Sequence, residues 1–184
     1  ALPDEEYNLN VMISYNSNVL GNQFAKLKSM SNFKKEIAPS RTFVFLHELE
    51  FLLNNNLVKG GDVDNAIIIM DRDVSQSELD RIADLFHHEH IKLNGQKGIL
   101  NNLKLHFDNE PARHKLLDLT GDLVLVGKPI KGKIIATRPG HSSNVQFAKL
   151  LYKEMNKQFS KTAPPVYDPD KEPIMDILKI RDLL

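Results

Sequence analysis

Polar and apolar residues alternate near the start of the chain with the period of two that is typical of a strand buried on one face. This pattern covers residues 7–15, and its apolar members are Tyr7, Leu9, Val11, Ile13 and Tyr15. Three further stretches favour strands. Residues 41–45 are aromatic and β-branched, residues 65–71 form a continuous apolar run, and residues 131–140 end in a Pro-Gly turn.

Apolar residues at helical spacing predict helices between and after these strands. Pro39 ends the first helix, and Ser75 or Ser77 caps the third. The predicted helices cover residues 31–40, 46–56, 75–90, 111–123 and 141–159. Helices and strands are interleaved without a regular βαβ repeat. We therefore expect an α+β fold in which an antiparallel or mixed sheet is packed on one face by two helices.

The composition changes toward the C-terminus. Residues 160–173 hold four of the nine prolines and almost no periodicity, which describes an extended tether. Apolar residues return at helical spacing in residues 174–184. We predict a domain over residues 1–158, a proline-rich linker over 159–172 and the start of a further domain over 173–184.

Charge and composition exclude several classes of protein. Twenty-four basic and twenty-four acidic residues cancel in this 184-residue chain, which argues against a nucleic-acid partner. The absence of cysteine rules out disulfides and thiolate metal sites. No apolar run approaches the ~20 residues of a membrane span, and no export signal is recognisable, so we expect no membrane span and a cytoplasmic location.

One predicted helix carries a column of polar residues. His114, Asp118 and Asp122 follow one another at intervals of four, so they project side by side from one face. Imidazole nitrogen and carboxylate oxygen both bind first-row metals, and two of them one turn apart can hold one ion at ~2.0–2.2 Å. We expect this column to face a cleft or a partner. The core-facing stripe expected on the other side comprises Leu117, Gly121, Val124 and Leu125, with Gly121 admitting a close neighbour.

An ordinary explanation competes with a metal site, because a histidine four residues from a carboxylate is more often a surface ion pair. Two features add weight to a functional site. His141 follows a Pro-Gly turn at a strand-to-helix junction, and Thr42 lies among aromatic residues. The remaining histidines give less support for a functional site. Residues 87–90 suit a solvated helix end, and His47 lacks the second histidine of a zincin helix. His106 is expected at the surface or a strand end.

Two segments resemble a known enzyme family. They are "SRTFVFLHELEFLLNNNLVKGGDVDNAIII" and "LHFDNEPARHKLLDLTGDLVLVGKPIKGKIIATRPGHSSN", with the motifs R-T-F-x-F, G-G-x-x-D-N-A, R-H-K-x-x-D followed by G-D, and a final G-H. In this order they resemble the second half of the zinc-dependent UDP-3-O-acyl-N-acetylglucosamine deacetylases of lipid A synthesis. The resemblance covers about residues 5 to 155 and implies an inserted βαβ piece in the fold.

The resemblance implies roles for individual residues. His114 and Asp118 match two ligands of the zinc ion, and Lys115 matches a lysine that contacts the substrate. Thr42 matches a threonine whose hydroxyl faces the reacting carbonyl. His141 matches a histidine that acts in its protonated form.

The remaining matches concern the partner of this histidine and the substrate. Asp122 matches the carboxylate that pairs with His141, while Phe43 and Phe45 match aromatics near the sugar and the nucleotide. Residues 46–69 match the inserted βαβ piece, which forms a hydrophobic passage for the acyl chain. The threonine hydroxyl and the imidazolium would stabilise the developing oxyanion, a contact worth ~3–4 kcal/mol when preorganised. The imidazolium would then protonate the departing amine.

The chain departs from the family in two ways. The third metal ligand and the glutamate general base belong to the first half of the family, which no segment here matches. Because a catalytic zinc needs about three protein ligands, we expect weak metal binding and an inactive fragment. Residues 73–102 are also longer than the expected connection. Two histidines and one carboxylate suit Zn²⁺ and Fe²⁺ alike, so the native metal stays open.

The last residues have a resemblance of their own. Residues 172–184, "EPIMDILKIRDLL", are similar to the start of a 3-hydroxyacyl-acyl-carrier-protein dehydratase, which is fused to this deacetylase in some bacteria. The implied partners are the acylated nucleotide sugar, the first half of the deacetylase and a C-terminal dehydratase. Two other classes stay open: a module that binds acyl chains or a partner protein without catalysis, and a different metal hydrolase.

Overall fold

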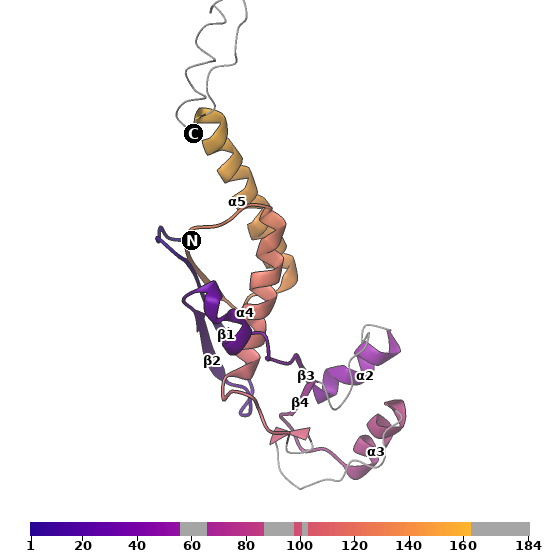
Figure 1. Ribbon diagram of the computed structural model, residues 1–184. Helices are drawn as coiled ribbons and strands as arrows, with labels where there is room; N and C mark the ends of the chain where they lie inside the picture. The colour runs from indigo at the N-terminus through magenta and orange to yellow at the C-terminus, as the bar shows by residue number, and fades with distance from the viewer. Residues whose placement is uncertain (56–65, 87–97, 101–102, 163–184) are drawn as a thin grey trace, which may run out of the picture.

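Two small sheets and the helices that cover them make up the fold. The computed structural model describes residues 1–55, 66–86, 98–100 and 103–162. Within these ranges, one mixed sheet has the strand order β2-β1-β6 and a second has the order β3-β4-β5 (Figure 1). The predicted α+β class is confirmed, with two three-stranded sheets where the sequence suggested one.

The first sheet joins strands from both ends of the described chain. Its central strand β1 (Tyr7–Ser14) pairs antiparallel with β2 (Asn22–Leu27) and parallel with β6 (Gly132–Thr137). The predicted alternation along β1 is confirmed from Val11 to Ser14, where buried and exposed residues alternate, whereas Asn10, between the fully buried Leu9 and Val11, is also buried. The core of the molecule therefore begins at this strand.

Strand β2 was not among the strands expected from the sequence. Its six residues include no β-branched side chain, so intrinsic preference for a strand is weak. Hydrogen bonds to β1 make it a strand instead. The turn between β1 and β2 is tight. Gly21 has the positive φ of 52°, its N–H donates to the Ser17 carbonyl at 2.9 Å, and its carbonyl accepts from the Tyr15 N–H at 3.0 Å.

Three helical elements cover this sheet. Helix α4 (Glu110–Leu123) begins with Pro111 in its first turn, as predicted, and continues into the 3₁₀ helix η3 (Val124–Val126). Helix α4 lies on β1 and β2, and α5 (His141–Thr162) packs against α4 (Figure 1). Because α5 continues to Thr162, the first residues of the expected linker are helical, while residues 163–184 lie outside the described range.

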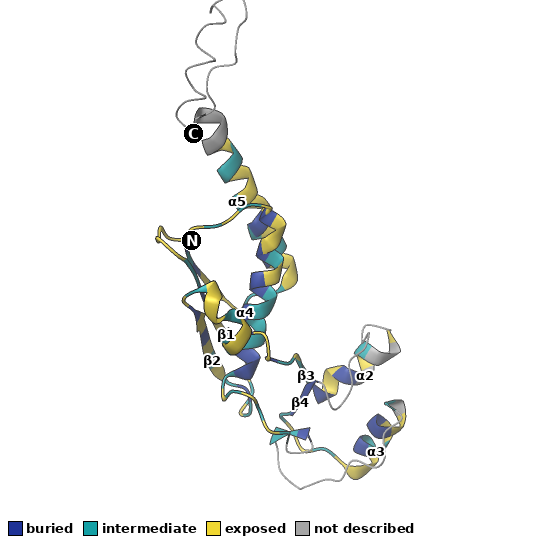
Figure 2. Cartoon of the chain, in the orientation of Figure 1, coloured by how far each residue is buried: buried dark blue, intermediate teal, exposed yellow. Residues whose placement is uncertain are grey.

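The core-facing stripe of α4 differs from the prediction. Val124 and Leu125 are 73% and 66% exposed, and a Cβ added at Gly121 would meet nothing within 4 Å. The expected stripe is only about 75° around the helix from the His114 column, at 100° per residue, so it does not lie opposite. The residues of α4 that are buried are Glu110, Pro111, Ala112, Leu116, Leu119, Thr120 and Leu123 (Figure 2).

Residues between β2 and the second sheet form short helices. The 3₁₀ helix η1 (Met30–Asn32) and α1 (Phe33–Glu36) confirm a helix before Pro39. Ile37, which follows them, is fully buried in the main core. The segment that leads to the second sheet is therefore packed against the core of the first sheet.

The second sheet contains the βαβ piece. Strand β3 (Phe43–Phe45), helix α2 (Leu46–Asn54) and strand β4 (Ile67–Met70) form it, with β3 and β4 parallel. This confirms the inserted piece expected from the resemblance. The continuous apolar run is a buried strand, as predicted, because all three isoleucines of β4 are at most 2% exposed.

One more helix and a short strand complete the second sheet. Helix α3 (Gln76–Leu85) is capped by Ser75, whose Oγ accepts from the Glu78 N–H at 3.3 Å, and β5 (Gly98–Ile99) pairs antiparallel with β4. A second apolar cluster joins α2, β4 and α3. None of the helices within the described ranges is both long and apolar enough to cross a bilayer.

Candidate functional site

The His114 and Asp118 side chains lie side by side on α4. The Nε2 atom of His114 is 3.4 Å from Oδ1 of Asp118, and the two side chains are 16% and 10% exposed. Two ligands of a tetrahedral zinc ion at ~2.1 Å lie about 3.4 Å apart, so this spacing fits shared coordination. The predicted pair is therefore brought together, although it is less open to solvent than a surface ion pair.

A backbone carbonyl orients the imidazole of His114. Its Nδ1 lies 3.2 Å from the Ser40 carbonyl oxygen. A carbonyl can only accept, so Nδ1 donates in this bond, and Nε2 is left on the side of Asp118. Metal-binding histidines are commonly held in this way. Ser40 itself is buried, and its Oγ has no partner among the described residues.

The donors of this pair fit part of a metal site. Among the described residues, no group of three or more His, Cys, Asp or Glu side chains could hold an ion. An imidazole and a carboxylate on one helical turn can supply two ligands, and Nε2 of this imidazole already faces the carboxylate. A complete catalytic site needs a further ligand from outside these residues.

Lys115 links the acidic residue to the strand that follows Thr42. Its Nζ donates to Oδ2 of Asp118 at 3.0 Å and lies 5.5 Å from the centre of the Phe43 ring. Asp118 is thus flanked by both a histidine and a lysine. Thr42 is exposed, and its carbonyl accepts from Ile67 at 2.8 Å, which ties it to β4.

The two predicted substrate-binding aromatics differ in exposure. Phe43 is partly exposed, whereas Phe45 is 8% exposed and belongs to the main core. Tyr15, expected from the sequence only as an apolar strand residue, contacts both rings, with ring centres 5.7 and 5.6 Å away. Phe45 also stacks on the ring of His47 at 5.5 Å. A row of rings therefore leads from Lys115 toward α2.

The predicted His141 and Asp122 pair is present at the start of α5. Nδ1 of His141 lies 2.9 Å from Oδ2 of Asp122. The same oxygen accepts from Nδ2 of Asn144 at 2.9 Å, and Asn144 is only 3% exposed. Asn144 was missed because its partner is 22 residues away, although its position one turn after His141 could have pointed to it.

A buried ion pair beside this site was also missed. Glu110 is fully buried, and its Oε1 accepts from the backbone N–H and the Nε of Arg41, both at 2.9 Å. Its Oε2 accepts from Nη2 of Arg41 at 3.0 Å and from the His106 backbone at 2.7 Å. Burial acts to raise the pKa of Glu110, but the hydrogen bonds from Arg41 and His106 outweigh it and hold that pKa below its usual range.

His106 is exposed, as the sequence predicted, and its side chain also contacts this cluster. Its Nδ1 lies 2.8 Å from the Pro39 carbonyl and 3.6 Å from Oε1 of Glu110. The spacing of four between His106 and Glu110 was the signal available in the sequence. Of the other histidines, His47 has its Nδ1 3.6 Å from Oδ1 of Asp71, just after strand β4. Residues 87–90 lie outside the described part of the chain.

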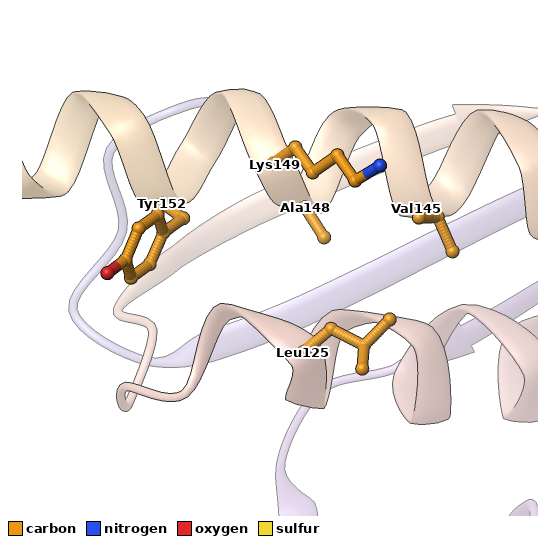
Figure 3. A pocket seen from close by; sticks show the side chains of 5 residues that line it. All are labelled: Leu125, Val145, Ala148, Lys149 and Tyr152. Carbon is orange, nitrogen blue, oxygen red and sulfur yellow. The ribbon is translucent and has the colours of Figure 1, made fainter.

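An apolar hollow lies one turn beyond the polar column. It has a volume of about 310 Å³ and is lined by Leu125 of η3 and, from α5, by Val145, Ala148, Lys149 and Tyr152. Figure 3 shows Leu125 pointing toward α5 across this hollow, where it remains 66% exposed. No polar group of the candidate site reaches this hollow.

Comparison with known proteins decides the family. The profile of the UDP-3-O-acyl N-acetylglycosamine deacetylases matches residues 1–95 and 87–153. The chain belongs to this family. The match includes every residue of the candidate site, from Thr42 to Asn144, and agrees with the resemblance drawn from the motifs.

Individual relatives show how the chain relates to longer proteins. It is 52% identical to the "Bifunctional enzyme LpxC/FabZ" of Bacteroides thetaiotaomicron over 183 residues, which is 100% of this chain and 39% of that protein. The protein of the same name in Porphyromonas gingivalis is 51% identical over 100% of this chain and 39% of its own length. The UDP-3-O-acyl-N-acetylglucosamine deacetylase of Chlamydia pneumoniae is 35% identical over 82% of this chain and 45% of its length. The chain thus spans less than half the length of these relatives.

Proposed function

We propose that this chain supplies the second half of the active site of a UDP-3-O-(3-hydroxyacyl)-N-acetylglucosamine deacetylase in lipid A synthesis. The observation that carries the proposal is the geometry of α4. His114 and Asp118 lie 3.4 Å apart, and one turn later Asp122 is paired with His141 at 2.9 Å. Helix α4 thereby carries both residues of the proposed metal-binding pair and also the carboxylate partner of the proposed proton donor, His141, which begins α5.

The native metal in this proposal is Zn²⁺, with Fe²⁺ as the alternative, and His114 and Asp118 would hold it. When bound, such an ion activates water and polarises the acetamide carbonyl. The chain's own contribution is the orientation of the imidazole through the Ser40 carbonyl. The third ligand and the general base would come from the first half of the full-length protein.

The other residues bind substrate and move charge. Thr42, an exposed residue between the contacts that Ser40 and Phe43 make with α4, would donate its hydroxyl hydrogen to the oxyanion. Protonated His141 would give its Nε2 proton to the departing amine while Asp122 holds Nδ1. Lys115 would exchange its contact with Asp118 for the substrate, and Phe43 and Phe45 would flank the sugar and the nucleotide.

Acetate release from the acylated nucleotide sugar by the full-length protein tests this function. We expect His114→Ala to remove nearly all activity and bound metal, and Glu154→Gln, on the exposed face of α5, to change neither. The 184-residue chain alone should release no acetate. Deacetylation by this chain, in a preparation free of host enzyme, would contradict the division of the site between two halves.

The same variants separate the two alternative classes. A module that binds only acyl chains or a partner protein would keep its ligand affinity in His114→Ala and in the absence of metal. A different metal hydrolase would also lose its metal in His114→Ala. Its wild-type form, however, would not deacetylate the acylated nucleotide sugar.

We further infer that a dehydratase follows the deacetylase in the full-length protein. Two relatives named as bifunctional enzymes align with the whole of this chain, including residues 172–184. Dehydration of a 3-hydroxyacyl-acyl-carrier protein by the full-length protein would test it, and the absence of that activity would count against a fused dehydratase.

A further inference from the structure

The segment that carries Thr42 runs beside α4 and touches it at three successive points. Ser40 accepts from the imidazole of His114 at 3.2 Å, and Arg41 binds Glu110. Phe43 lies 5.5 Å from Nζ of Lys115. Thr42 is therefore held between a contact to one proposed metal ligand and a contact to the neighbouring lysine.

The contact made by Arg41 is the strongest of the three. Its backbone N–H, Nε and Nη2 all donate to the Glu110 carboxylate, and Nη2 also donates to the Lys104 carbonyl at 2.9 Å. The carboxylate is fully buried, and the Arg41 side chain is 17% exposed. Forked, charge-assisted bonds of this kind fix direction as well as distance, which the single bond to His114 does not.

We propose that Arg41 and Glu110 are positioning residues, which lock residues 40–43 against α4 so that the Ser40 carbonyl fixes the His114 tautomer and Thr42 is presented beside it. The inference rests on the proposed deacetylase function. It extends that function to an ion pair that touches neither substrate nor metal. His106 completes the lock, because its ring holds the preceding carbonyl, that of Pro39, at 2.8 Å.

The first arm of the test is kinetic and uses the full-length protein. Arg41→Lys keeps the charge but loses the fork, and we expect kcat to fall about 10- to 100-fold with little change in KM, as for other residues that orient metal ligands. The matched control is Arg72→Lys, because Arg72 also forms a two-pronged pair, but with Glu78 of helix α3. Ethylguanidinium should restore activity to Arg41→Ala, and ethylammonium should not.

The second arm needs no activity. Long-range ¹⁵N–¹H spectra of the metal-free 184-residue chain report which ring nitrogen of neutral His114 carries the proton. The wild type and Arg72→Lys should show the Nδ1–H tautomer alone, and Arg41→Lys a mixture of both tautomers.

An unchanged kcat in Arg41→Lys overturns the proposal. So does a kcat that falls only in step with the folded fraction while the His114 tautomer stays as in the wild type, because the pair is then a structural contact alone. If the wild-type full-length protein does not deacetylate the nucleotide sugar, the proposed function fails, while the tautomer spectra still decide whether Arg41 positions His114.

Discussion

Replacing Glu110 by Gln tests how much the buried ion pair stabilises the fold. The two carboxylate oxygens accept two hydrogen bonds each, from Arg41 on one oxygen and from Arg41 and His106 on the other. A Gln side chain has one acceptor oxygen, so in either orientation its NH₂ faces two donors and two bonds are lost. Bonds to charged groups contribute about 1.5–3 kcal/mol each, and breaking a buried pair costs about 3–5 kcal/mol.

We expect Glu110→Gln to lower the free energy of unfolding by about 3 kcal/mol, toward the lower figure because the Arg41 side chain retains some contact with water. With a urea m-value of about 2 kcal/mol/M, the unfolding midpoint should fall by about 1.5 M. Circular dichroism of the 184-residue chain at pH 7 measures it. Glu154→Gln is the matched control, since that carboxylate forms an exposed pair with Lys157 and should matter by less than about 0.5 kcal/mol.

The difference between wild type and Glu110→Gln should depend on pH. The folded-state pKa of Glu110 is lowered, so its contribution is complete above the ordinary pKa of 4.5 and is lost as the pH falls through the lower, folded value. The two midpoints should therefore draw steadily closer as the pH falls below 4.5. Equal midpoints at pH 7, or a gap that stays constant between pH 5 and pH 3, would refute this account of the pair.

Two further substitutions test the packing of α4 and the support of Asp122. Leu116 is fully buried, so Leu116→Ala should lower the free energy of unfolding by about 2–5 kcal/mol. Leu125 is 66% exposed, so Leu125→Ala should lower it by far less. Equal losses of the two variants in urea titrations would mean that Leu116 does not belong to the buried face of α4. Asn144→Leu removes a donor from the Asp122 carboxylate and should cost about 1–3 kcal/mol and lower kcat of the full-length protein, with the exposed amide variant Gln146→Leu as control. An Asn144→Leu protein with wild-type kcat would show that Asp122 needs no such support.

Local patterns predicted the parts of the site that lie close together in the chain. His114 and Asp118 are one helical turn apart, so their proximity follows from helix geometry alone. The strand alternation of β1 and the buried run of β4 followed in the same way from periodicity. The pairing of His141 with Asp122, across 19 residues, came from the family resemblance and is confirmed.

Contacts between distant segments were beyond local patterns. Arg41 and Glu110 are 69 residues apart, and a glutamate in a first helical turn is ordinarily an exposed residue that suits the helix dipole. The burial of Leu116 in place of Leu117 depends on which side of α4 the sheet approaches. Strand β2 depends on β1 as its partner, because its own residues favour a strand only weakly.

The parallel pairing of β1 with β6 sets the order in which this chain can fold during synthesis. Tyr7 lies opposite Gly132, so a ribosome working at about 5–20 residues per second needs on the order of ten seconds to deliver the partner of the first strand. Helix α4, which covers Leu9 and Val11, is also made late. The apolar face of the nascent hairpin is therefore bare throughout that interval, which makes it a natural client for chaperones that bind chains still emerging from the exit tunnel.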